Sequence, residues 1–134
     1  MKARVVIDSN IYVSAIVFGG TPKSLLALAE RGRFEICTSR IIRQEVERTL
    51  KEKFGWAQKN INLACAPLWA IAYHVESRSC LNVTDDPDDN HILECAVAGL
   101  ARVIVTGDND LLRLKSFESI EILKARAFLN RYEQ

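Results

Sequence analysis

Acidic side chains at four separate places in the chain have the types and positions needed to bind a divalent cation. They are Asp8, Glu45, Asp89 and Asp108. Like charges gathered within a few ångströms repel each other by about 1 kcal/mol or more per pair near a protein surface, so such a cluster needs a cation to neutralise it. Carboxylate oxygens suit Mg²⁺ or Mn²⁺, which keep several waters and take further ligands from a substrate phosphate. We therefore expect metal-assisted chemistry at a phosphate group.

Two of these acids directly follow apolar runs that predict buried strands. Asp8 ends the run Val-Val-Ile-Asp, and Asp108 ends the run Val-Ile-Val-Thr-Gly-Asp. Ligands of an open parallel sheet collect beyond the carboxyl ends of its strands, so both aspartates are expected at the same edge. A single aspartate at a strand end is equally compatible with a turn. The coincidence of two favours a functional site.

Helical periodicity predicts that Glu45 lies next to the buried face of a helix. It lies beside the apolar stripe Ile42, Val46 and Leu50 of a helix predicted over residues 40–53. An acid that served only solubility would be expected on the far face of that helix. The alternative is an exposed glutamate paired with Arg48 or Thr49.

The segment 85–90, Asp-Asp-Pro-Asp-Asp-Asn, is the densest acidic cluster of the chain. Asp86 precedes a proline and is predicted to cap the following helix, with a weaker role as a ligand. Asp89 has Ile92 and Leu93 at the i+3 and i+4 positions, so its side chain is expected to lean along the buried face of the helix. Asp88 is less well aligned, and Asp89 is therefore the preferred site residue.

The remaining residue types exclude several other kinds of site. His74 and His91 lie in no recognisable catalytic triad, which agrees with a metal-activated water as the nucleophile. The four cysteines are widely spaced and form no CxxC pair, so a zinc site is not expected. We expect them to be reduced and mostly buried.

The elements that must position these acids alternate between strand and helix. Strands are predicted near residues 3–7, 34–37, 73–75, 102–106 and 120–122. Helices are predicted near residues 11–17, 21–32, 40–53, 56–72, 86–99, 109–114 and 124–132, with Thr21 as the N-cap of the second. This alternation predicts an α/β fold, with helices on both faces of a parallel sheet.

The bulk properties fit one small domain spanning residues 1–134. The chain has 134 residues, 49% of them hydrophobic and 26% charged, and a net charge of +1. That charge argues against a strongly basic coat for nucleic acids but allows a local basic patch. No apolar run reaches the roughly 20 residues of a membrane span, and the first residues do not resemble a signal peptide. We expect a cytoplasmic protein without a membrane segment.

Taken together, the motifs resemble those of the PIN-domain ribonucleases, many of which are toxins of bacterial and archaeal toxin–antitoxin pairs, as in the VapC-like proteins. The matching pieces are Val5–Asn10, Glu45 in a helix after the second strand, Asp86–Asn90 and Val105–Asp108. Their order and spacing cover almost the whole chain. Each piece alone is weak, whereas all four together are fairly specific.

The resemblance implies a three-layer α/β/α sandwich around a parallel sheet of four or five strands. It implies Mg²⁺ or Mn²⁺ at Asp8, Glu45, Asp89 and Asp108, and hydrolysis of phosphodiester bonds in single-stranded RNA. It also implies a homodimer and an antitoxin protein as partners. Positions that match weaker supporting ligands are Asn10 and Thr106, followed by Ser9 and Asp110. Weak candidates for contact with substrate phosphates are Lys23, Arg40, Arg43, Arg113 and Lys115.

Two other functions are compatible with the same residues. Phosphatases with an aspartate nucleophile also carry an Asp after the first strand, but they usually have a second Asp where this chain has Asn10. A receiver domain phosphorylated on aspartate is related, but no Asp closes a strand at the centre of this sequence. The other possibility is a non-catalytic module that binds protein or RNA and uses its acids only as caps and turns.

Overall fold

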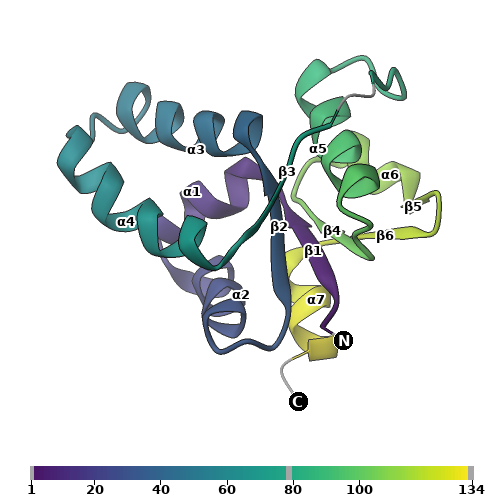
Figure 1. The fold of residues 1–134 in the computed structure, drawn as a ribbon, viewed down its shortest axis with the longest axis horizontal. Coiled ribbons are helices and arrows are strands. Elements are labelled where there is room, and N and C mark those ends of the chain that lie inside the picture. Colours follow the sequence, from purple (N-terminus) through teal and green to yellow (C-terminus); the bar gives the residue numbers. More distant parts are fainter. Residues whose placement is uncertain (1, 78–79, 133–134) are drawn as a thin grey trace.

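The computed structural model describes residues 2–77 and 80–132, which form a six-stranded sheet with helices on both faces (Figure 1). The elements are, in order, β1 (Arg4–Ile7), α1 (Ser9–Val17), α2 (Gly20–Glu30), β2 (Glu35–Ser39), α3 (Arg40–Glu52), α4 (Gln58–Ile71), β3 (Tyr73–Val75), α5 (Pro87–Ala98), β4 (Val103–Val105), α6 (Asn109–Leu114), β5 (Ser116–Phe117), β6 (Ile120–Leu123) and α7 (Ala125–Tyr132).

The sheet has the strand order β3-β2-β1-β4-β6-β5. Its first five strands in that order run parallel, which confirms the predicted sheet of four or five parallel strands. The sixth, β5, is only two residues long and pairs antiparallel with β6. Strand β1 lies between β2 and β4, with Val6 opposite Cys37 on one side and Ile104 on the other. This central position explains the uninterrupted apolar sequence of β1.

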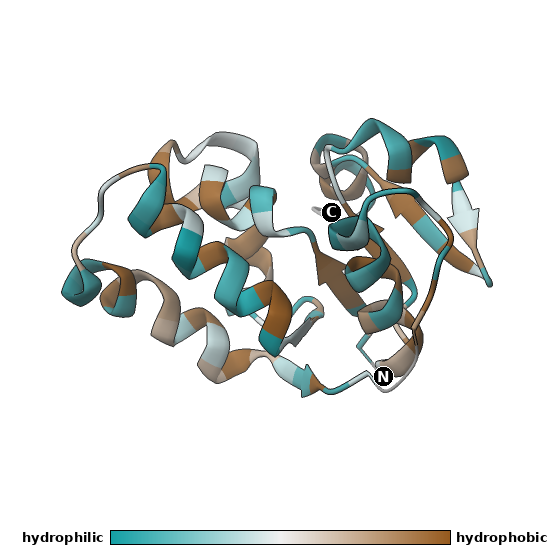
Figure 2. Ribbon diagram, turned by 90° about the horizontal axis from the view of Figure 1, so that it is seen from above, coloured by the Kyte–Doolittle hydropathy of each residue, from teal (hydrophilic) through white to brown (hydrophobic). Residues whose placement is uncertain are grey.

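Helices cover the two faces of the sheet unequally (Figure 1). Helices α1, α2 and α7 lie on one side, while α5 packs against β1, β2 and β4 on the other, next to α6. Helices α3 and α4 contact each other and extend beyond the sheet on the side of α1 and α2. Figure 2 shows mostly hydrophobic strands between helices that carry both hydrophilic and hydrophobic residues. The strands that precede Asp8 and Asp108 are therefore buried in the core.

The predicted N-cap of the second helix is wrong. Helix α2 begins at Gly20, with Gly19 as its N-cap, and both glycines have positive φ angles of 67° and 79°. Glycine tolerates this left-handed conformation, so the chain turns from α1 into α2 before it reaches Thr21. The Thr21 hydroxyl instead accepts a hydrogen bond from Arg126 at 2.8 Å.

The cysteines follow the prediction with one exception. Cys37, Cys65 and Cys95 are buried, whereas Cys80 is exposed, and all four are free thiols. Among the described residues, no single helix is long and apolar enough to cross a membrane. Only α1 and α2 taken together, across a bend of 103°, have the required length and composition.

Candidate metal centre

Strands β1 and β4 deliver Asp8 and Asp108 to the same edge of the sheet, as their sequences predict. The backbone N–H of Asp8 donates to the carbonyl of Val105 at 2.9 Å, which ties the ends of the two strands together. The buried Thr106 links the two acids: its hydroxyl donates to Asp8 Oδ2 at 2.7 Å and accepts from the backbone N–H of Asp108 at 3.0 Å. Thr106 therefore fixes the positions of both acids relative to each other.

The N-terminus of α5 brings two more aspartates to this edge. Asp86 is the N-cap, and its Oδ1 accepts from the backbone N–H of Asp88 at 2.9 Å. Asp89 points inward and is only 4% exposed, in agreement with its helical alignment. Asp86, Asp89 and Asp108 each contribute one carboxylate oxygen, and these three oxygens lie within 4.8 Å of one another. Three acids from two distant segments thus form one group.

The Asp89 carboxylate indicates most clearly that this group of acids lacks a ligand. Its Oδ2 atom is buried and has no hydrogen-bond partner among the described residues. A buried polar atom without a partner costs roughly 1–3 kcal/mol, more if it is charged, and calls for a specific explanation. A hard cation bound by these oxygens would supply the missing partner, and an all-carboxylate donor set fits such an ion.

Electrostatics at the site favour a bound cation for the same reason. Burial, reinforced by the charges of Asp108, Asp86 and Asp8, raises the pKa of Asp89 to about 7. Burial also raises the pKa of Asp8, although the hydrogen bond from Thr106 opposes the shift. Both shifts mean that the site disfavours its full negative charge, and a metal ion would remove that penalty.

Glu45 lies apart from the group of three. It is half-buried on α3, and the group that comes together in the structure contains Asp86 instead. Burial, followed by the charge of Asp88, raises the pKa of Glu45, with a smaller contribution from Asp8 and an opposing hydrogen bond with Ser9. Glu45 therefore borders the carboxylate edge from the α3 side without joining the three closest oxygens.

The weaker supporting residues have distinct places. Ser9 is buried and donates to Asp8 Oδ1 at 3.3 Å, whereas Asn10 is exposed. Asp110 is exposed and forms an ion pair with Arg113, which is thereby held on the surface of α6. Thr106 is the best placed of these residues, because it bonds both to Asp8 and to the backbone of Asp108.

The basic candidates for substrate contact do not form one patch with the acids. Arg43 forms a hydrogen bond with the His74 ring, and Lys23 lines a surface hollow together with Thr21 and Arg126. Arg40, in contrast, borders a cavity between α3 and α5.

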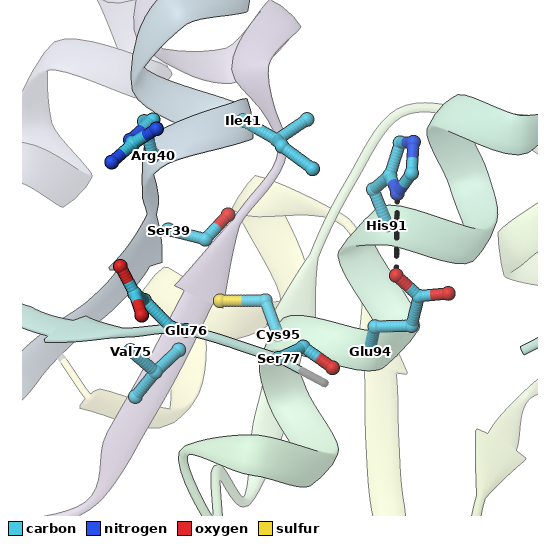
Figure 3. A pocket seen from close by; sticks show the side chains of 9 residues that line it. All are labelled: Ser39, Arg40, Ile41, Val75, Glu76, Ser77, His91, Glu94 and Cys95. Atoms are coloured by element: carbon cyan, nitrogen blue, oxygen red, sulfur yellow. Dashed lines mark hydrogen bonds and ion pairs between the residues drawn. The ribbon is translucent and has the colours of Figure 1, made fainter. Parts of the chain in front are cut away.

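Sequence reasoning missed this cavity and the buried acid beside it. Glu94 is 9% exposed; its Oε2 accepts from the backbone N–H of Leu81 at 2.7 Å, and its Oε1 lies 3.2 Å from His91 Nδ1. Figure 3 shows this pair on α5 at the side of the cavity. The one available signal was the position of Glu94 directly after the apolar pair Ile92 and Leu93.

Comparison with known proteins identifies the family of the chain. An uncharacterized protein of Methanocaldococcus jannaschii is 28% identical over 121 residues, covering 86% of this chain and 77% of the relative. A chain of VapBC2 from Rickettsia felis, crystallised bound to a DNA fragment from the promoter, has a similar fold with a TM-score of 0.63 and 16% identity. That match covers 89% of this chain and 96% of the other. Residues 4–110 match the PIN domain family, a span that includes all the acids described above. The chain thus belongs to the PIN domain family of nucleases.

Proposed function

We propose that this protein is a Mg²⁺- or Mn²⁺-dependent endoribonuclease that hydrolyses phosphodiester bonds of single-stranded RNA. The observation that carries the proposal is the buried, unpartnered Oδ2 of Asp89 within reach of Asp86 and Asp108 oxygens. Buried polar atoms in folded proteins nearly always have a partner, so this oxygen favours a ligand that the protein alone does not supply. Membership of a nuclease family supports the same interpretation.

The protein would hold the metal ion through Asp8, Asp89 and Asp108, with Asp86 as an additional ligand and Glu45 facing them from α3. When bound, the ion would activate a water molecule and stabilise charge on the phosphate. Backbone amides prepare the carboxylates for this role. Oδ1 of Asp86 accepts from Asp88, and Oδ1 of Asp108 accepts from Asp110 and Leu111. Asp86 and Asp108 thus each have one oxygen anchored and the other left for a ligand.

The side chains of Thr106 and Ser9 orient Asp8. Both of its oxygens accept side-chain hydrogen bonds, at 2.7 Å from Thr106 and 3.3 Å from Ser9. A carboxylate oxygen has a second lone pair, so these bonds orient Asp8 without preventing coordination. Because Thr106 also binds the Asp108 backbone, displacement of one acid would disturb the other.

The proposed cellular role is that of a toxin neutralised by an antitoxin protein, with a homodimer as the assembly. The structural similarity to a chain of VapBC2 supports this proposal at the level of the fold. Growth arrest on induced expression in a bacterium would support it if Asp108→Asn abolished the arrest. Unimpaired growth with active, soluble nuclease would count against a toxin.

The decisive assay measures cleavage of single-stranded RNA with Mg²⁺ or Mn²⁺, with single-stranded DNA as the comparison substrate. Asp8→Asn and Asp108→Asn should each reduce the rate by at least about a hundredfold, since each removes a proposed ligand. Asp88→Asn is the matched control, because it removes the same charge from an exposed neighbour. Undiminished cleavage in EDTA would contradict the metal-dependent mechanism.

The alternatives make different predictions. A non-catalytic binding module predicts a melting temperature that does not change with added Mg²⁺ or Mn²⁺. A phosphatase or receiver-type domain predicts a stable acyl-phosphate on Asp8 after treatment with a small phosphodonor. The family match makes the second alternative the weaker one.

A further inference from the structure

A cavity of about 220 Å³ lies beside the carboxylate edge, between α3 and α5. Its walls come from the end of β2, the start of α3, the segment that begins at the end of β3, and one face of α5. In Figure 3, Ile41 lies across the cavity from His91, while the Ser39 side chain lies next to the Cys95 sulfur. None of the proposed metal ligands lines it, so the cavity is a separate feature of the site.

Helix geometry connects the cavity with the proposed metal centre. Ile41 lines the cavity, and Glu45 follows it by four residues on the same face of α3. His91 lines the cavity from α5, and Asp88 precedes it by three residues on the same face. Glu45 and Asp88 are electrostatic neighbours, so the two helices approach each other there. The cavity therefore lies about one helical turn from Glu45, which borders the carboxylate edge.

The lining has the chemistry of a site for a flat heteroaromatic ring. Ile41 and Val75 supply apolar surface, and His91 supplies an imidazole held in place by Glu94. The Ser39 oxygen accepts from the backbone N–H of Ile42 at 3.4 Å, and its hydroxyl interacts with the Cys95 thiol, which fixes this polar group at the cavity wall. The volume lies below the roughly 300–1,000 Å³ of pockets for drug-sized molecules. A single ring system with polar edges is the matching ligand class.

We propose that this cavity binds one unstacked nucleobase, next to the phosphodiester bond that is cleaved. The identity of the polymer rests on the proposed nuclease function, whereas the fit to a base rests on the lining alone. Single-stranded RNA is commonly recognised through splayed bases that stack on aromatic side chains and form hydrogen bonds at their edges. Arg40 donates and the Glu76 carboxylate accepts at this cavity. Guanine has two acceptors on one edge and donors on another, so it is preferred over adenine.

Nuclear magnetic resonance can test base binding without any cleavage. The chain has two histidines: His91 lines the cavity, while His74 contacts Arg43 and the Trp69 carbonyl. In EDTA at fixed pH, the four ribonucleoside monophosphates should shift the His91 ring signals saturably and leave His74 unchanged, with GMP binding more tightly than AMP. Ribose 5-phosphate controls for binding through sugar and phosphate alone, and should have no effect.

Two matched variants assign the binding to this cavity. Ile41→Ala removes one wall and should weaken GMP binding about fivefold. Ile71→Ala is the control, because Ile71 is 42% exposed on α4, close to the 44% of Ile41, and lies outside the cavity lining. Arg40→Gln should remove the preference for GMP over AMP. A His91 shift that is absent, equal with ribose 5-phosphate, or unchanged in Ile41→Ala would overturn the proposal.

Cleavage of a random-sequence RNA provides the second measurement. Ile41→Ala should raise KM more than it lowers kcat, and should flatten the base preference at one position next to the cut. Failure of the nuclease proposal alone would appear as GMP binding to the cavity without RNA cleavage. Failure of the base site alone would appear as metal-dependent cleavage with no His91 shift and an unchanged base preference in Ile41→Ala.

Discussion

Replacement of Asp89 by asparagine should make the metal-free protein more stable at mildly alkaline pH while abolishing its response to divalent cations. Asparagine has nearly the same shape as aspartate but no charge, so the substitution tests the electrostatic cost of the buried carboxylate. That carboxylate is 4% exposed, and its Oδ2 has no hydrogen-bond partner among the described residues. Its retention despite this cost is expected only if a ligand compensates.

The magnitude follows from the pKa of Asp89, which rises from 3.8 to about 7. Between these values the folded protein retains a proton that the unfolded chain has released, so the free energy of unfolding falls as pH rises. At about 1.4 kcal/mol per pKa unit, the loss above neutral pH is roughly 4 kcal/mol if Asp89 alone carries it. The neighbouring carboxylates titrate together with it, so we expect Asp89→Asn to recover about 1–3 kcal/mol.

Urea unfolding in EDTA, at about pH 5 and about pH 8, measures this effect. The advantage of Asp89→Asn over the wild type should be clearly smaller at the lower pH, where less than half of the loss has occurred, and should reach its full size at the higher pH. Asp88→Asn is the control; it should lose about 0.5 kcal/mol at both pH values, because an exposed first-turn acid interacts favourably with its helix.

Added metal provides the second half of the test. At pH 8, a hundredfold excess of Mg²⁺ or Mn²⁺ over its dissociation constant should stabilise the wild type by about 2.7 kcal/mol. The same addition should leave Asp89→Asn nearly unchanged. A metal-free wild type as stable as Asp89→Asn at pH 8 would refute the reasoning, because the buried carboxylate would then carry no electrostatic penalty.

Three further substitutions separate the roles of neighbouring residues. Thr106→Val should lower the free energy of unfolding by about 1–3 kcal/mol in urea titrations and reduce RNA cleavage, because Asp8 and the Asp108 amide lose their shared partner; Thr106→Ser should restore both. Asn90→Ala should increase amide hydrogen exchange at residues 83 and 84, whose N–H groups both donate to the Asn90 side chain, at 3.1 and 2.9 Å. Glu45→Gln should slow cleavage more than tenfold if Glu45 is a ligand. If Glu45→Gln cleaves RNA as fast as the wild type, the proposed metal ligands are limited to four aspartates, namely Asp8, Asp86, Asp89 and Asp108.

Several features of the site were predictable from sequence because they depend on one element at a time. An apolar, β-branched run followed by a polar residue identifies the end of a buried strand, and this placed Asp8 and Asp108 at one edge. Asp86 before a proline predicted the N-cap of α5, which the structure confirms. The spacing of Asp89 from Ile92 and Leu93 predicted its inward orientation, because helical periodicity alone decides which face a residue occupies.

Other features depend on how separate elements approach each other, which periodicity does not determine. Sequence reasoning ranked Asp86 mainly as a cap, yet the docking of α5 against β1 and β4 brings its carboxylate into the group with Asp89 and Asp108. Glu45 is half-buried on α3, and burial together with the nearby charges of Asp88 and Asp8 raises its pKa, yet it lies outside the group of three oxygens. The cavity between α3 and α5 arises in the same way. The sequence by itself thus determined the elements and the faces of the acids, whereas the crossing of helices over the sheet decided which of them meet.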